Sequence, residues 1–451
     1  MTAFPSQQRP SDSGGAGIQL QPGIPICQTD LPLDWYQEAF RPYAEEYHAL
    51  PDRTPEVVLP WLDRYVEPAR EHFGPSLLLL AHYYMGGEIV KLVERYGGAV
   101  ADSYALALQA ARNPERKVIV ESAVHFMAEA VAILAHDDQK VWITNPKAGC
   151  TMEMLAKDYM VDPIADQLLE RYGDELAVVA YMNTSGRLKA LAGRTGGAVC
   201  TSSNAHLVVD WVRQQGKKIL FVPDQHLGRN TAAKLGMNLS KLVTLPDPQV
   251  HAANYNLEDG TIEGGIKALD AAEMILWGSY CGVHTVFKPE MVQWWKERDW
   301  QVHVHPESPL ETVEAADGSG STAYLWKVVM DAPQGSKIVI GTEGNFVRNA
   351  RAQAALRGVE IMHLADIPDE NFRAAGCGCA TMSRNDPPHL AGMLDLLRRD
   401  QAPDLNLVLA GDSVNEVTAA RDRLAPAERS ALIAHARQSL ERMISITEAA
   451  N

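Results

Sequence analysis

Short apolar runs alternate with longer amphipathic stretches along the chain from about residue 50 onwards. The runs are rich in aliphatic and β-branched residues, and this alternation is typical of α/β folds. We predict strands over residues 76–83, 117–122, 140–145, 176–181, 197–202, 218–223, 274–280, 300–305, 337–342 and 359–364. They form three groups of about three strands, the third beginning at residue 274. The pattern therefore predicts a weak threefold repeat of three-layer units, with a period of roughly 100 residues.

Polar side chains suited to chemistry follow nearly every predicted strand. The first group is followed by "AHYYMGGE", "SAVHFMAE" and "NPKAGCTM", and the second by "YMNTSGRLKA", "CTSSNAH" and "PDQHLGRN". The third group is followed by "CGVH", "HPES" and "GTEGN". Ligands of open parallel sheets bind at the carboxyl ends of the strands. We therefore expect three sheets whose carboxyl ends face one centre, with Cys150 and Cys281 on that edge.

Composition narrows the class of protein. The chain has 451 residues and a formal net charge of −16, which argues against a nucleic-acid surface, because phosphate binding needs clustered Lys and Arg. No apolar stretch approaches the ~18–20 residues that span a bilayer. Residues 1–50 lack the apolar core of a signal peptide, and we interpret them as a flexible leader. We therefore expect a cytoplasmic protein that binds neither nucleic acid nor membrane.

Six cysteines lie at positions 27, 150, 200, 281, 377 and 379. A cytoplasmic chain keeps its thiols reduced, which favours metal binding or catalysis over disulfides. The lack of a CxxC pair argues against zinc, because zinc sites usually build on such pairs. Cys281 ends a predicted strand with His284 one helical turn later, whereas we interpret Cys27 and Cys200 as ordinary buried small residues.

Ten short motifs, taken in order, resemble the quinolinate synthase A family. They are "AHYY", "VHFMAE", "NPKAGCTM", "YMNTSGRLKA", "CTSSNA", "FVPDQHLGRN", "WGSYCGVHTVF", "HPE", "GST" and "GTEGN", and they lie within about residues 75–385. The resemblance implies three αβα domains, related by a pseudo-threefold axis, around a central iron–sulfur cluster. We expect a leader, a first domain (51–149) completed by C-terminal helices (383–451), a second domain (150–280) and a third domain (281–382).

The resemblance also implies the reaction and the cofactor. Iminoaspartate and dihydroxyacetone phosphate would condense to quinolinate, phosphate and two waters, a transferase step of NAD biosynthesis. L-Aspartate oxidase would supply the iminoaspartate. Matched by motif, the ligands of one [4Fe–4S] cluster are Cys150 in "AGCTM", Cys281 in "CGVH" and Cys379 in "CATM". Three cysteines leave one iron without a protein ligand, and such an iron can act as a Lewis acid.

The catalytic candidates come from two strand ends. The resemblance makes His82 and Tyr84 contacts for the triose that assist its isomerisation. His305 and Glu307 follow the strand 300–305, and Glu307 is the candidate general base. His284 either contacts the substrate or stabilises the cluster indirectly, by contacting the residues that are its ligands.

The substrate-binding candidates also include five further residues. The resemblance makes Tyr181 and Asn183 hydrogen-bond partners of the intermediate. Ser103, Ser202 and Thr322 are candidates for binding a carboxylate or phosphate. Hydroxyls at such positions equally suit N-caps, because capping and anion binding use the same exposed N–H groups.

Part of the sequence departs from the family pattern. The segment "CGCATMSRNDPPHL" keeps the C-x-x-M of the third ligand but loses the basic helix that usually follows, and it adds Cys377 as an alternative to Cys379. Glu343 suits either a helix cap or support of the site. Two other functions remain open at this point. One is another open-iron enzyme, aconitase-like or diphthamide-type, and the other is a periplasmic-type binding protein with incidental cysteines.

Overall fold

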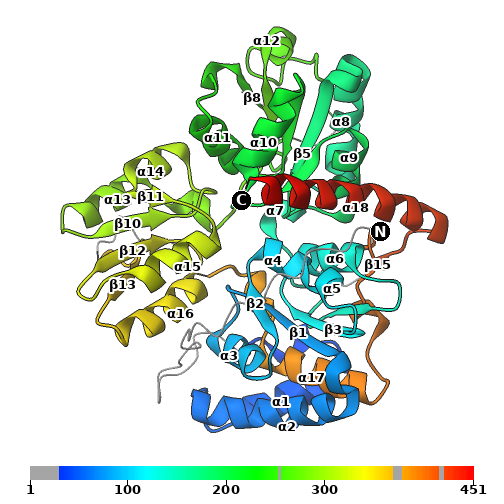
Figure 1. The fold of residues 1–451 in the computed structure, drawn as a ribbon, viewed down its shortest axis with the longest axis vertical. Coiled ribbons are helices and arrows are strands. Elements are labelled where there is room, and N and C mark those ends of the chain that lie inside the picture. The colour runs from blue at the N-terminus through cyan, green and yellow to red at the C-terminus, as the bar shows by residue number, and fades with distance from the viewer. Residues whose placement is uncertain (1–29, 252–254, 369–377, 416–420, 451) are drawn as a thin grey trace.

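The computed structural model describes residues 30–251, 255–368, 378–415 and 421–450. Three parallel sheets flanked by helices form three lobes around a common centre (Figure 1). The strand orders are β2-β1-β3-β4 in the first, β6-β5-β7-β9-β8 in the second and β11-β10-β12-β13 in the third. The first four strands of each order thus occupy equivalent places in the three sheets. The predicted α/β fold is confirmed.

The first unit is built on β1 (Leu77–His82), which is buried throughout. Helices cover both faces of a parallel sheet, so such strands are apolar on both sides. Leu79 accordingly packs in one core and Leu80 in another. The other elements of this unit are α1 (Arg41–His48), α2 (Pro55–Phe73), α3 (Gly87–Arg95), β2 (Ala99–Ala101), α4 (Ser103–Ala107), α5 (Gln109–Arg112), β3 (Val118–Ser122), α6 (His125–Leu134) and β4 (Lys140–Ile143).

The second unit repeats this plan around β5 (Leu176–Tyr181). Val179 faces the core shared with the first unit, and Val178 faces a separate core. The other elements are α7 (Thr151–Met154), α8 (Asp158–Tyr172), α9 (Gly186–Arg194), β6 (Ala198–Cys200), α10 (Ala205–Gln214), β7 (Lys218–Val222), α11 (Gln225–Lys234), β8 (Leu242–Thr244), α12 (Gly265–Ala271) and β9 (Met274–Leu276).

The third unit is centred on β10 (Gln301–Val304) and β12 (Lys337–Gly341), which pair in parallel. Its two sides have their own cores, one containing Val302 and Val304 and the other Ile338 and Ile340. The other elements are α13 (Pro289–Lys296), α14 (Leu310–Ala315), β11 (Gly318–Ser319), α15 (Thr322–Asp331), α16 (Gly344–Ala355) and β13 (Glu360–His363).

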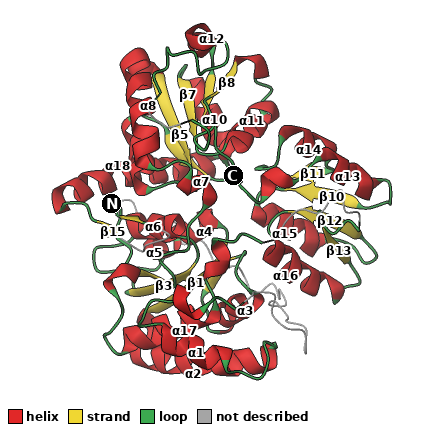
Figure 2. Cartoon of the chain, turned by 180° about the vertical axis from the view of Figure 1, so that it is seen from behind, coloured by secondary structure: helices red, strands yellow, loops and turns green. Residues whose placement is uncertain are grey.

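The C-terminal segment packs on two units. Helix α17 (Pro387–Arg398) lies against α1, α2 and α3, whereas α18 (Pro426–Ala449) packs mainly against α9, α10 and β6 and also touches α6. Figures 1 and 2 show α18 lying between the first and second lobes. Between the two helices, β14 (Ser413–Val414) pairs with β15 (Arg421–Asp422). The domain boundaries expected at residues 150 and 281 stay a prediction.

Glu129 of α6 ties three parts of the chain together. Its carboxylate accepts hydrogen bonds from the backbone N–H of Gly186 and of Gly411, each at 2.7 Å. A Cβ at Gly186 would lie 2.4 Å from Glu129 Oε1, so the close approach of α9 to this carboxylate requires glycine. The contact fixes the second unit and the C-terminal segment against the first.

The structure corrects one grouping of strands and adds five short ones. The run 274–280, which we grouped with the third set, ends the second unit, because β9 pairs with β7 and β8. The sequence did not predict β2, β8, β11, β14 and β15, which have only two or three residues each. In the described part of the chain, no helix has the length and apolar character needed to cross a membrane.

Candidate active site

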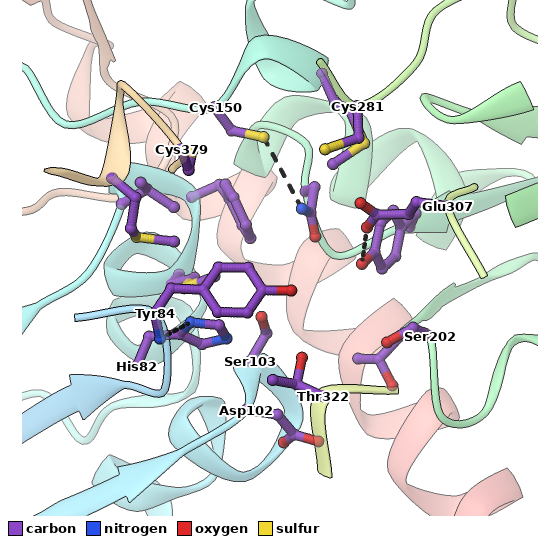
Figure 3. A pocket seen from close by; sticks show the side chains of 18 of the residues that line it. His82, Tyr84, Asp102, Ser103, Cys150, Ser202, Cys281, Glu307, Thr322 and Cys379 are labelled. Atoms are coloured by element: carbon purple, nitrogen blue, oxygen red, sulfur yellow. Dashed lines mark hydrogen bonds between the residues drawn. The ribbon is translucent and has the colours of Figure 1, made fainter. Parts of the chain in front are cut away.

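One cavity lies at the centre, where the carboxyl ends of the three sheets meet. The space between its lining atoms, part of it open to solvent, amounts to roughly 630 Å³. Figure 3 shows the cysteines on one side of this cavity and the Ser and Thr hydroxyls on the other. The described residues for which the sequence predicted a catalytic, substrate-binding or cluster-ligand role lie in its wall: His82, Tyr84, Ser103, Cys150, Tyr181, Asn183, Ser202, Cys281, His284, His305, Glu307, Thr322 and Cys379. Their common location is established, and their individual roles stay predictions.

Three free thiols enter the cavity. Each follows the strand that stands fourth in its sheet, which is β4, β9 or β13. Cys150 caps α7 after β4, Cys281 follows β9 and Cys379 follows β13. Burial raises the pKa of each thiol, and mutual interaction among the three raises those of Cys150 and Cys281 further. Cys200 is buried in the core on β6, as predicted for a small residue. Cys27 and Cys377 lie outside the described residues.

The three sulfurs are too far apart to share one ion. Among the described residues, the one group of three or more metal-binding side chains within 4.8 Å of one another is Cys281, His284 and Glu307. Tetrahedral zinc with Zn–S bonds of about 2.3 Å needs sulfurs about 3.8 Å apart. The trio Cys150, Cys281 and Cys379 therefore suits a centre larger than one ion, and thiolates suit iron–sulfur clusters.

Acidic helix caps hold two of the cysteines in equivalent positions. Asp224 lies two residues after β7 and is the N-cap of α11. Its carboxylate accepts hydrogen bonds from the backbone N–H of Leu227 at 2.6 Å and from that of Cys281 at 3.1 Å. Glu343 lies two residues after β12 and is the N-cap of α16. Its carboxylate accepts hydrogen bonds from the backbone N–H of Phe346 at 3.0 Å and from that of Cys379 at 3.3 Å. Since β7 and β12 have the same place in their sheets, Cys379 is the structural counterpart of Cys281. Glu343 is thus both a cap and a support of the site.

The first unit holds its cysteine differently. The N-cap of α6 is Val124, which has no side-chain acceptor. The backbone just before the cysteine is nevertheless held in the same way in the first and second units. In the first unit His125 N donates a hydrogen bond to Ala148 O, and in the second Gln225 N donates one to Ser279 O, each at 2.9 Å. Ala148 and Ser279 each lie two residues before the cysteine of their unit. At the sulfur itself, Asn183 Nδ2 lies 3.9 Å from Cys150 Sγ.

We predict that Asp224→Ala destabilises the protein more than loss of an ordinary cap. The change removes the cap of α11 and leaves the buried Cys281 N–H unpaired, which together cost about 2–4 kcal/mol. The control is Ser185→Ala, which removes the cap of α9 in the same unit without touching a cysteine. Urea unfolding of the two variants tests this, and equal losses of unfolding free energy would contradict it.

Glu307 lies at the centre of a buried hydrogen-bond network. Its carboxylate accepts from Tyr181 Oη at 2.5 Å and lies 2.7 Å from His284 Nδ1. Burial alone raises the pKa of Glu307, but interaction with His305 and His284, together with the hydrogen bonds from His284 and Tyr181, lowers it to about 2. The rings of His284 and His305 stack with centroids 4.5 Å apart. Glu307 is therefore an ionised acceptor held by donors from two units.

His82 and Tyr84 enter the cavity from the first unit. Their rings meet edge to face with centroids 4.6 Å apart, and the Tyr84 backbone N–H donates to His82 Nδ1 at 3.2 Å. Burial lowers the pKa of His82 to about 3, so its imidazole is neutral. Burial and the charge of Glu307 raise the pKa of Tyr84 well above its usual value, so the phenol keeps its proton.

The hydroxyl side of the cavity is built from helix starts and a strand end. Ser103 begins α4 and Thr322 begins α15, whose cap is Ser321. Ser202 follows β6. The hydroxyls and the free N–H groups at the start of α15 together can bind an anionic group.

The sequence did not point to Asp102 as a lining residue. Asp102 caps α4 by accepting Ala105 N at 3.0 Å, and it lines the cavity beside Ser103. Burial raises the pKa of its carboxyl. The signal was its position directly before Ser103 at the end of a strand, but β2 was too short to be predicted.

Three αβα units that bring thiols, imidazoles and a carboxylate into one central cavity define a multi-unit α/β enzyme. Residues 69–445 match the family model described as "Quinolinate synthetase A protein". The chain is 35% identical over 411 residues to quinolinate synthase of Corynebacterium glutamicum, covering 90% of this chain and 93% of the relative. It is 39% identical over 360 residues to quinolinate synthase of Streptomyces coelicolor, and the match covers 79% of this chain and 86% of that relative. The protein belongs to the quinolinate synthetase A family.

Proposed function

We propose that this protein condenses iminoaspartate with dihydroxyacetone phosphate to give quinolinate, phosphate and two waters. Its family membership makes it an enzyme of quinolinate synthesis in NAD biosynthesis. The observation that carries the detailed proposal is the convergence of Cys150, Cys281 and Cys379 beside Glu307 in one cavity. Family membership also argues against an aconitase-like or diphthamide-type enzyme and against a binding protein with incidental cysteines.

The donor set fits a [4Fe–4S] cluster held by Cys150, Cys281 and Cys379. The equivalence of Cys379 and Cys281 at their acidic caps supports Cys379 as the third ligand. When bound, such a cluster supplies one iron without a protein ligand, which can act as a Lewis acid in the dehydration steps. Asn183, close to Cys150 Sγ, and His284, 3.1 Å from Cys281 Sγ, would stabilise the thiolates by hydrogen bonds.

In this proposal Glu307 is the general base. It is ionised in the free protein, as proton removal requires. A substrate that displaced the Tyr181 hydroxyl from Glu307 would remove a hydrogen bond that lowers its pKa and would bring the pKa closer to neutral, where a base works best. His305 would orient the substrate beside Glu307, and Tyr181 and Asn183 would hydrogen-bond the intermediate.

The triose phosphate would bind between the first unit and the hydroxyl side of the cavity. His82 and Tyr84 would contact the triose and assist its isomerisation, because one is a neutral imidazole and the other a protonated phenol. Ser103, Ser202 and Thr322 would bind the phosphate or the carboxylates. L-Aspartate oxidase would supply iminoaspartate, and we place the reaction in the cytoplasm.

Iron dependence tests the proposed cofactor. A [4Fe–4S] cluster with an open iron is easily oxidised, so we expect activity to disappear in air and to return with iron, sulfide and a reductant. The measurement is quinolinate formation before exposure, after exposure and after reconstitution, with iron per chain determined at each stage. Full activity of a zinc-loaded, iron-free preparation would contradict the proposal.

A further inference from the structure

Asn230 of the second unit holds the loop of the third unit that carries Glu307. It lies on α11, is buried and lies outside the lining of the cavity. Its Nδ2 donates hydrogen bonds to the backbone carbonyls of Pro306 and Ser308, each at 2.8 Å. These two residues flank Glu307 in the chain. Because both acceptors are carbonyl oxygens, only the amide nitrogen can face them, and the direction of these hydrogen bonds depends on no titratable group.

The loop of the first unit is held in the same way by Asn349 of the third unit. Asn349 lies on α16, is buried and donates through Nδ2 to Met85 O at 3.2 Å. It lies six residues after Glu343, the cap of α16, just as Asn230 lies six residues after Asp224, the cap of α11. The two asparagines therefore have equivalent positions in equivalent helices, and each reaches into a neighbouring unit.

The two loops that these asparagines hold also have equivalent structures. The backbone N–H of Tyr84 donates to His82 Nδ1 at 3.2 Å, and that of Glu307 donates to His305 Nδ1 at 3.4 Å. In both loops the residue directly after this donor provides a carbonyl that the asparagine binds. Tyr84 is thus the structural counterpart of Glu307. Each asparagine holds a loop that presents one candidate catalytic side chain to the cavity.

We propose that Asn230 is a positioning residue that holds Glu307 at its place in the cavity from across the boundary between two units. Asn349 does the same for Tyr84. The Glu307 carboxylate accepts a hydrogen bond from Tyr181, which belongs to the second unit, as Asn230 does. The second unit thus fixes both the carboxylate and the backbone that bears it. Because it assigns this placement to the removal of a proton by Glu307, the inference rests on the proposed function.

Hydrogen exchange of the backbone amides tests the positioning without any substrate. The variants are Asn230→Leu and Asn349→Leu, which both remove the amide donor and nearly keep the shape of the side chain. In Asn230→Leu the loop 305–308 loses two hydrogen bonds and should exchange about tenfold faster, whereas the loop 82–85 should keep its rate. Asn349→Leu should show the reverse pattern. The measurement is mass spectrometry of the anaerobic, iron-loaded proteins.

Turnover separates positioning from a merely structural role. Asn230→Leu should keep its iron and its affinity for dihydroxyacetone phosphate but lower kcat about ten- to hundredfold, because misplacing a reacting group by about 1 Å can cost that much. In the Glu307→Gln background Asn230→Leu should cause no further loss, since no base is left to misplace. Asn349→Leu should instead weaken the binding of dihydroxyacetone phosphate, measured by calorimetry.

The milder variant Asn230→Ala is prepared beside Asn230→Leu and should give the same pattern, so that poor folding of one leaves the other to decide. Unchanged exchange in the loop 305–308, equal acceleration of both loops, or a full further loss of kcat in the Glu307→Gln background would each overturn the inference. If the exchange results hold but the unaltered protein forms no quinolinate, the proposed function fails and the support of the two loops stands.

Discussion

The variant Cys379→Ser, prepared without oxygen, should contain little iron and lose the broad absorption near 400 nm that marks the cluster. The structure places Cys379 in the cavity with the other two thiols, its backbone held by the cap of α16 as Cys281 is held by the cap of α11. A serine cannot replace the thiolate as a soft ligand, so one iron would be left under-ligated. The measurement is iron per chain, compared with the unaltered protein.

Two matched variants make this result specific. Cys200→Ala removes a buried thiol on β6, outside the cavity, and should keep its iron. Cys377→Ser should also keep nearly all of its iron, because the C-x-x-M motif favours Cys379. A colourless Cys377→Ser beside a brown Cys379→Ser would reverse the assignment of the third ligand.

Glu307→Gln should assemble a normal cluster but lower turnover by about 10²–10⁴-fold, the usual cost of losing a general base. Glutamine preserves the size of the side chain and can still accept from Tyr181 Oη, but it cannot take up a proton. Iron per chain and the absorption spectrum should therefore match the unaltered protein while kcat falls. The measurement is steady-state quinolinate formation by anaerobic protein at saturating substrate.

Near-normal turnover of Glu307→Gln would move the base to His305 or Tyr84. A colourless Glu307→Gln variant would instead indicate that the carboxylate serves the cluster, since Glu307 lies close to Cys281 and His284. Tyr181→Phe is the matched control, because it removes a hydrogen bond to Glu307 without removing the carboxylate. We expect it to lower kcat much less.

Long apolar runs made most of the fold predictable from the sequence. Strand β1 and its counterpart β5 are buried on both faces, so their runs were clear, and the polar residues after them marked the edge where the cavity lies. Short strands such as β11 carry almost no pattern. The place of β9 in the second sheet depends on pairing with β7, which no local pattern reports.

The residues that line the site were predictable from the sequence, but the residues that hold the structure around them in place were not. Cysteines, histidines and Glu307 after strands are chemically conspicuous, and family resemblance gave them candidate roles. Asp224 holds the backbone of Cys281, 57 positions away in the chain, and Glu129 holds that of Gly411, 282 positions away. Such contacts depend on the tertiary structure. Their side chains were indistinguishable in the sequence from ordinary caps and core residues.

We propose that three units close one cluster-containing active site for quinolinate synthesis. The most direct test is to supply iminoaspartate and dihydroxyacetone phosphate to anaerobic, iron-loaded protein and to measure quinolinate and phosphate. The account predicts both products in equal amounts, with formation dependent on the cluster. Fully iron-loaded protein that forms no quinolinate from the two substrates would contradict it.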